Sequence, residues 1–302
     1  LSLQGCQVDF INYHPDYVEA GGDFNYKNPF SKKNLKILFL KLIQLKERFF
    51  GDGHQKNNFN DFRVNKLGVR GKYYKSLADI DGKLSGYDLL ICGSDQIWKP
   101  SEHFGVDPVY FLDFSLAGST PRKISYAPSF GKDSLDTQYT QHVVSLISKL
   151  DGVSVREKSG CAIISNLLGS EPVCVPDPTL LLKDYHDIIK PYPLKSAKHV
   201  FCYALRSRTG IGNVAESIAS KLSCALYSQH KPHRRWREIG ETVFPCPQQW
   251  LYLLSTSEFV VTNSFHGTAL SIILHKPFFV VGLQGDRSVF NARVKNLLSL
   301  VG

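Results

Sequence analysis

The sequence predicts an α/β protein made of two Rossmann-like halves that face a cleft. Three observations support this prediction: short apolar strands alternate with helical stretches, the alternation restarts after residue 178, and several strands end in polar clusters. Alternating strands and helices are typical of parallel sheets covered by helices. A chain of 302 residues is long enough for two domains. We therefore predict a first domain over residues 1–178 and a second over residues 179–302.

The first predicted domain contains four short strands that are each followed by polar residues. The strands lie at residues 87–92, 123–127, 152–155 and 173–175, and a helix is expected over residues 160–168. Ligands of open α/β sheets bind at the carboxyl ends of the strands, so these polar clusters are candidates for a site. Ser, Asp and Gly also simply make turns, but four such clusters in succession weaken that alternative.

The second predicted domain repeats the alternation. Strands are expected at residues 199–204, 224–227, 259–261 and 277–281, and helices over residues 212–222 and 250–255, after residue 264 and from about residue 291. The Pro-Tyr-Pro stretch at residues 191–193, which has lysines on either side, resembles a linker.

One histidine lies where a buried strand gives way to a helix. The apolar run at residues 259–261 is followed by Thr-Asn-Ser, which are common N-cap residues, and then by a helix with an apolar face. His266 is therefore expected in or beside the first helical turn, where backbone N–H groups attract anions. A histidine at such a position is also a common cap or packing residue.

Composition limits the classes of function. The net charge of +9 favours acidic partners. The basic stretch at residues 231–237 lacks a recognisable nucleic-acid module, so we expect it to border a cleft for an anionic substrate, with no nucleic acid bound. No apolar run approaches the roughly 18 residues that a membrane helix needs. We therefore expect a cytoplasmic protein.

Sequence fingerprints of bound metals and cofactors are missing. The seven cysteines are scattered and form no C-x-x-C pair, which argues against a zinc site. Neither a G-x-G-x-x-G nor a P-loop motif occurs, so dinucleotide or P-loop phosphate binding is not supported. We expect neither a metal nor a cofactor.

Five short motifs occur in order along the chain: GSDQIW (93–98), SYAPSFG (125–131), SVREKS (154–159), DPTLL (177–181) and TNSFHGT (262–268). Together they resemble the polysaccharide pyruvyl transferase family. The resemblance implies a GT-B-like fold and transfer of a pyruvyl group from phosphoenolpyruvate to sugar hydroxyls as a ketal, in the synthesis of a cell-surface polysaccharide or exopolysaccharide. Its implied partners are phosphoenolpyruvate and a glycan or lipid-linked sugar. A basic protein of this kind could also rest on the inner face of an anionic membrane.

The resemblance also implies roles for particular residues. The histidine of the helix-start motif, here His266, is the first catalytic candidate, because a group that titrates near neutrality can donate or accept a proton. Asp95 is the second, since it follows a strand into the predicted cleft and could orient a sugar hydroxyl. Further substrate-binding candidates are Ser94, Gln96, Ser129, Arg156, Gly267 and Thr268.

The anionic donor should be held by arginines. Many family members have an arginine two residues before the histidine, whereas this chain has Ser264, itself a substrate-binding candidate. We expect the missing charge to come from Arg206, Arg156, Arg287 or Arg293, with Arg206 favoured because it follows the strand at residues 199–204. Arg156 and Glu157 could equally form an ion pair between domains.

Two alternatives remain open at the level of sequence. One is a GT-B-type glycosyltransferase that uses a nucleotide sugar, with the basic stretch at residues 231–237 holding the diphosphate. The other is a glycan-binding relative that has lost catalysis, for which Ser264 is the sequence hint.

Overall fold

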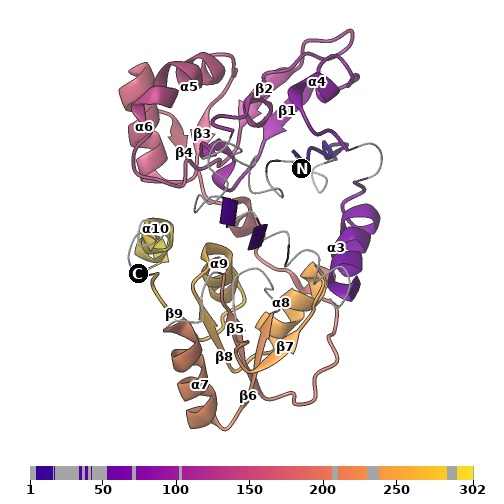
Figure 1. Ribbon diagram of the computed structural model, residues 1–302, viewed down its shortest axis with the longest axis vertical. Helices are drawn as coiled ribbons and strands as arrows, with labels where there is room; N and C mark the ends of the chain where they lie inside the picture. Colours follow the sequence, from indigo (N-terminus) through magenta and orange to yellow (C-terminus); the bar gives the residue numbers. More distant parts are fainter. Residues whose placement is uncertain are drawn as a thin grey trace. The chain divides into compact units, whose positions relative to one another are not determined.

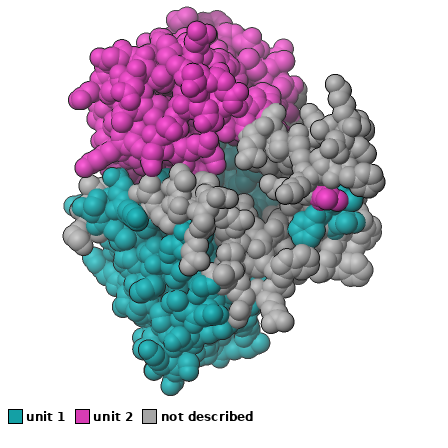
Figure 2. All heavy atoms as spheres, turned by 60° about the vertical axis from the view of Figure 1, so that its left-hand side comes forward, with its two compact units in different colours: residues 1–11, 38–70, 182–302 teal, residues 12–37, 71–181 magenta. Residues whose placement is uncertain are grey.

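The computed structural model describes residues 5–15, 17, 34–35, 38–39, 42, 53–69, 73–101, 104–205, 210–229, 238–283 and 291–301. The chain divides into two compact units, coloured separately in Figure 2. Unit 1 consists of Leu1–Ile11, Leu38–Arg70 and Leu182–Gly302, and unit 2 of Asn12–Ile37 and Gly71–Leu181. The predicted domain boundary follows residue 178, and in the structure the chain passes from unit 2 to unit 1 after Leu181. Part of the N-terminal region, Leu38–Arg70, groups with the C-terminal half of the chain.

Unit 1 is built on a five-stranded parallel sheet (Figure 1). Its strand order is β7-β6-β5-β8-β9. The chain starts in the middle, moves outward to one edge, and then returns to the other side of β5. This is the order of the first five strands of a doubly wound Rossmann sheet, and it creates a switch point between β5 and β8. The strands are β5 (His199–Tyr203), β6 (Ala225–Gln229), β7 (Glu241–Val243), β8 (Phe259–Thr262) and β9 (Phe278–Val280).

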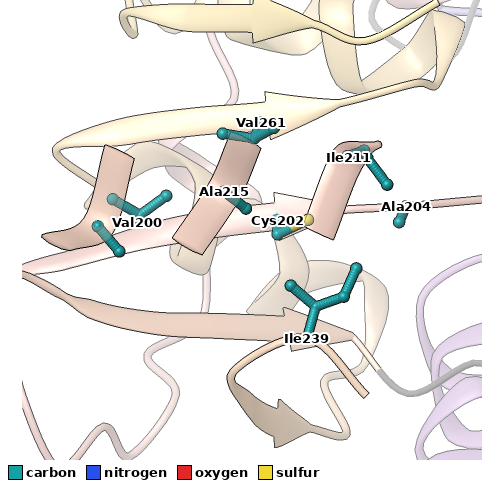
Figure 3. Packing of buried hydrophobic residues seen from close by; sticks show 8 residues of the cluster. Val200, Cys202, Ala204, Ile211, Ala215, Ile239 and Val261 are labelled. Carbon is teal, nitrogen blue, oxygen red and sulfur yellow. The ribbon is translucent and has the colours of Figure 1, made fainter. Parts of the chain in front are cut away.

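Helices pack on both faces of this sheet because alternate residues of its strands point to opposite sides. Val200, Cys202 and Ala204 of the β5 segment pack with Ala215 of α7 (Ile211–Leu222) in one core cluster, shown in Figure 3. Phe201 belongs to a second cluster on the other face, with residues of α8 (Pro247–Ser255) and α9 (Phe265–Ile273). Apolar residues at successive strand positions therefore indicate burial on two faces.

Two more helices are grouped with unit 1: α3 (Gly53–Asn65) and α10 (Asn291–Val301). No helix in the described part of the chain is long and apolar enough to cross a bilayer.

Unit 2 contains two parallel strand pairs, β1 (Leu89–Cys92) with β2 (Arg122–Ser125) and β3 (Ser154–Val155) with β4 (Val173–Cys174). A parallel bridge between Ile124 and Gly152 joins β2 to the segment that enters β3. The other elements are α4 (Leu77–Ile80), α5 (Thr140–Ile147), α6 (Lys158–Leu168) and the 3₁₀ turns η2 (Gln96–Trp98), η3 (Pro108–Phe111), η4 (Thr137–Tyr139) and η5 (Pro178–Leu180).

Two serines connect β2 to β3 where a regular ladder is missing. The hydroxyl of Ser154 donates to the carbonyl of Ser125 over 2.7 Å, and the hydroxyl of Ser125 donates to the carbonyl of Ser154 over 2.8 Å. These bonds satisfy buried polar groups that the short strands would otherwise leave unpaired. The ends of β2 and β3 are thereby held side by side.

The structure confirms the α/β class and the parallel strands, but the sequence analysis missed several elements. It did not predict β7, α3, α4 or α5, because short or weakly apolar segments give little periodic signal. The linker interpretation of residues 191–193 is wrong. Tyr192 packs against the second core cluster of unit 1, and its hydroxyl accepts the N–H of Phe244. The aromatic ring of Tyr192 thus packs residues 191–193 against the core of unit 1.

Candidate functional site

Polar residues that follow three of the four strands of unit 2 meet one another. Ser94 and Asp95 follow β1, Arg156 and Glu157 follow β3, and Asp177 follows β4. We call these five residues the Arg156 cluster. Parallel strands bring their carboxyl ends to one edge of a sheet, which is why residues far apart in sequence come together here.

Arg156 is bound by three carboxylates within unit 2. Its Nη1 lies 2.6 Å from Oδ2 of Asp177, its Nε 2.8 Å from Oε1 of Glu157, and its Nη2 3.4 Å from Oδ1 of Asp95. The side chain is only 2% exposed. Burial lowers the pKa of Arg156, but the charges and hydrogen bonds of Glu157 and Asp177 outweigh it and raise the pKa overall, so the group stays charged. These ion pairs join parts of one unit, not two domains.

Asp177 fixes both the arginine and the turn that follows β4. Its Oδ2 accepts the hydroxyl of Ser94 over 2.7 Å, and its Oδ1 accepts the N–H and the hydroxyl of Thr179 over 3.0 and 2.9 Å. Asp177 is thus the N-cap of η5. Its side chain is 2% exposed, which is tolerable for a carboxylate only because it is paired and hydrogen-bonded.

Asp95 differs from its neighbours in being open to solvent and in an unusual backbone conformation. Its side chain is 57% exposed, and its φ and ψ are 74° and −170°. Its carbonyl accepts the N–H of Ser129 over 2.8 Å. Ser129 is 1% exposed, and its hydroxyl accepts the N–H of Gly131, so in this structure Ser129 shapes the turn after β2.

Gln96 lies against Gly131. A Cβ at Gly131, where φ is +67°, would come within 2.9 Å of the Gln96 side chain. Trp98, the last residue of the GSDQIW motif, is 1% exposed and stacks on Phe111 with ring centroids 4.8 Å apart. Packing is therefore its role in this structure.

In unit 1, His266 lies at the switch point of the sheet. It is the second residue of α9, which follows β8, and β8 pairs with β5. The N-cap is Ser264, whose hydroxyl accepts the N–H of Gly267 over 3.3 Å. The start of a helix at a switch point concentrates positive backbone potential where open α/β sheets bind ligands.

Thr262 holds this turn in place. Its hydroxyl donates to the carbonyl of Tyr203 over 2.9 Å and accepts the N–H of Ser264 over 3.0 Å. Gly267 lies directly against it, since a Cβ there would be 2.4 Å from Oγ1 of Thr262. Only glycine leaves room for this close approach of helix and strand. Thr262 was part of the quoted motif but was not predicted to shape the site.

His266 itself is half-buried, and its ring meets that of Phe265 edge to face with centroids 5.4 Å apart. Asn263 ties the turn to the end of β5, because its Oδ1 accepts the N–H of Leu205 over 2.7 Å. Two predicted donor-binding residues, Arg206 and Arg287, lie outside the described residues. Arg293 is half-buried in α10.

Several predicted binding residues use their side chains inside the protein. Ser264 is 2% exposed as the helix cap, and Thr268 is fully buried with its hydroxyl donating to the carbonyl of Ser264. Arg156 and Ser129 are likewise occupied within unit 2. Among the predicted site residues at strand ends, Asp95 is exposed, and Ser94, Gln96 and His266 are partly exposed. Within the described residues, no three His, Cys, Asp or Glu side chains group as metal ligands.

Comparisons with known proteins bear on this arrangement. The sequence model of the family described as polysaccharide pyruvyl transferase matches residues 4–285. A search of curated proteins finds no match. Among solved structures, an S. aureus MnaA–UDP co-structure is similar at 12% identity and a TM-score of 0.45, with 79% of this chain and 76% of that chain covered. The UDP-GlcNAc 2-epimerase from Methanocaldococcus jannaschii is similar at 9% identity and a TM-score of 0.39, covering 98% and 86%. Similarities of this size are too weak to indicate a function.

Proposed function

This chain belongs to the polysaccharide pyruvyl transferase family, and from this premise we propose that its donor is phosphoenolpyruvate and that its product is a pyruvate ketal on a glycan. Membership makes the protein an enzyme that transfers pyruvyl groups in polysaccharide biosynthesis. The observation that carries the proposal is the position of His266, at the start of α9 and at the switch point between β5 and β8.

The chemistry of the donor suits this position. Phosphoenolpyruvate carries a phosphate and a carboxylate, and the N-terminus of a helix attracts both. Ketal formation needs a proton at the methylene carbon, after which C2 gains cationic character and is attacked by a sugar hydroxyl. Loss of phosphate and attack by a second hydroxyl complete the ketal. An imidazole can supply the first proton or accept one from the attacking hydroxyl, and in this proposal His266 does so.

Asp95 is proposed to orient the acceptor. Its carboxylate is exposed at the end of β1 and can accept a hydrogen bond from a sugar hydroxyl. Gln96, which follows it directly, offers an amide for a second hydroxyl. Ser264, Thr268 and Arg156 support the proposal as residues that shape the two strand ends.

The donor is tested by thermal-shift titration of the purified protein with phosphoenolpyruvate and, separately, with a panel of nucleotide sugars and nucleoside diphosphates. Phosphoenolpyruvate at about 100 times its Kd should stabilise the folded state by about 2.7 kcal/mol. Stabilisation by a nucleotide sugar alone would instead favour glycosyl transfer and overturn the proposal.

The reaction is tested by phosphate release. Incubation with phosphoenolpyruvate and a candidate glycan should release phosphate in proportion to ketal formed, and the His266→Ala protein should release none above background. Donor binding without any phosphate release across a broad glycan panel would favour a non-catalytic relative.

A further inference from the structure

Asp95 adopts a backbone conformation that is essentially reserved for glycine. Five non-glycine residues have positive φ among the described residues. Leu112 and Ser223 show the usual left-handed form, with ψ of 28° and 46°. Asp95 instead combines φ 74° with ψ −170°, a region in which any Cβ is strained. The conformation thus costs free energy that the surrounding structure must supply.

The surrounding structure holds Asp95 from two sides. Its carbonyl accepts the N–H of Ser129, as part of a parallel bridge between Asp95 and Pro128 that extends the β1–β2 pairing. Its carboxylate lies 3.4 Å from Nη2 of Arg156. Arg156 is itself fixed by the shorter contacts to Asp177 and Glu157, both of which are almost fully buried. The exposed carboxylate is therefore positioned by a rigid, buried arginine.

The ion pair alone does not explain an aspartate at this position. Arg156 already has two carboxylates at closer range, so Asp95 adds a third negative charge to a single positive one. A pair with one partner more than half exposed is also screened by water and contributes little. For stability alone, glycine would be the better residue, because it relieves the strain without breaking the buried pairs.

We infer that Arg156, with Glu157 and Asp177, is a positioning assembly that holds Asp95 in a strained conformation so that its carboxylate meets the acceptor sugar hydroxyl. This inference rests on the proposed function for the identity of the acceptor. Arg156 acts through Asp95 and does not need to touch the substrate. Strain of this kind is a recurring feature of functional sites, where a side chain must be aimed before the substrate arrives.

The strain is tested by Asp95→Gly, with Ser223→Gly as the matched control. Ser223 has positive φ at the C-terminus of α7 in unit 1, is exposed and belongs to no proposed site. Each variant should raise the Tm of the unit that contains it by about 2–4 °C. Only Asp95→Gly should lower kcat/KM for the acceptor, by about 100-fold, while the KM for phosphoenolpyruvate stays unchanged. A lower Tm for Asp95→Gly, or full activity in it, would overturn the inference.

The positioning role is tested by a double-mutant cycle. Arg156→Lys should reduce kcat/KM at least about tenfold in the wild-type background and cause no further loss in the Asp95→Gly background, because the residue that it positions is gone. Equal losses in both backgrounds would show that Arg156 acts independently of Asp95. If Arg156→Lys does not fold, Glu157→Gln provides the same cycle with an isosteric change.

The outcomes separate this inference from the proposed function. The Tm comparison uses no donor or acceptor, so it decides the strain even if phosphoenolpyruvate is not a substrate. If the wild-type protein does not transfer pyruvyl groups but Asp95→Gly is more stable than the wild type, the proposed function is rejected and the strain at Asp95 is confirmed. If the wild-type protein transfers pyruvyl groups but Asp95→Gly is less stable than the wild type, the proposed function is kept and the strain at Asp95 is rejected.

Discussion

Residues next to His266 in the chain fix its position at the start of α9. The strand before it is buried, Ser264 caps its helix, and Gly267 lets the helix approach Thr262. A half-buried imidazole at a helix start is accessible to a ligand and close to positive backbone potential. Both properties suit proton transfer to a bound anion.

Replacing His266 by alanine should therefore affect chemistry far more than folding. We expect His266→Ala to lower kcat by about 10²–10⁴-fold, the usual contribution of a general acid or base. Its Tm should change little, since the side chain is only half-buried and lies in the first turn of the helix. His275→Ala is the control, because His275 is exposed just after the end of the same helix. Comparable loss of activity in both variants would contradict a catalytic role for His266.

Gly267 is the residue on which the geometry of this turn depends most. In Gly267→Ala, the new methyl would meet Oγ1 of Thr262, which cannot rotate away without losing its bonds to Tyr203 and Ser264. We expect the free energy of unfolding to fall by about 1–3 kcal/mol, as for other overpacked cores. Gly93→Ala, where a Cβ would meet nothing within 4 Å, should be near neutral. Denaturant titration compares the two variants.

At the scale of the element, α9 depends on its cap. Ser264 supplies both the side-chain acceptor for Gly267 and the carbonyl that accepts the N–H of Thr268. A serine at this position provides the short side-chain acceptor that caps the helix.

Two substitutions of Ser264 distinguish the effect of the helix cap from the effect of charge at the start of α9. Ser264→Ala should destabilise the protein by about 1 kcal/mol through loss of the N-cap. Ser264→Asp keeps a cap acceptor and should retain more stability, but its negative charge at the helix start should weaken binding of an anionic donor at least tenfold. Thermal unfolding and donor titration of both variants check this. Unchanged donor affinity in Ser264→Asp would place the donor away from α9.

At the scale of the whole molecule, each unit has its own stabilising centre. Unit 1 is organised by two core clusters on the faces of one five-stranded sheet. Unit 2 combines short strand pairs with the buried ion pairs of Arg156 with Glu157 and Asp177. Interactions internal to one unit should control the unfolding of that unit.

We therefore expect calorimetry to resolve two unfolding transitions. Asp177→Asn leaves the buried charge of Arg156 without its closest partner and should lower one transition, with a cost of about 3–5 kcal/mol. Gly267→Ala should lower the other. A single transition that both variants shift equally would show that the chain unfolds as one cooperative unit.

Sequence alone determined the parallel α/β class, the polar strand ends and the placement of His266 at a helix start. These follow from local periodicity and capping chemistry, which are properties of neighbouring residues. Only the tertiary structure decided the strand order that makes a switch point beside His266, because strand order depends on contacts between distant segments. The tertiary structure also shows that Arg156, a candidate anion ligand in the sequence, is buried and paired with Glu157 and Asp177. Burial and ion pairing of this kind cannot be derived from a short motif. The strain at Asp95 is equally a tertiary property, because bonds from other strand ends enforce its backbone conformation.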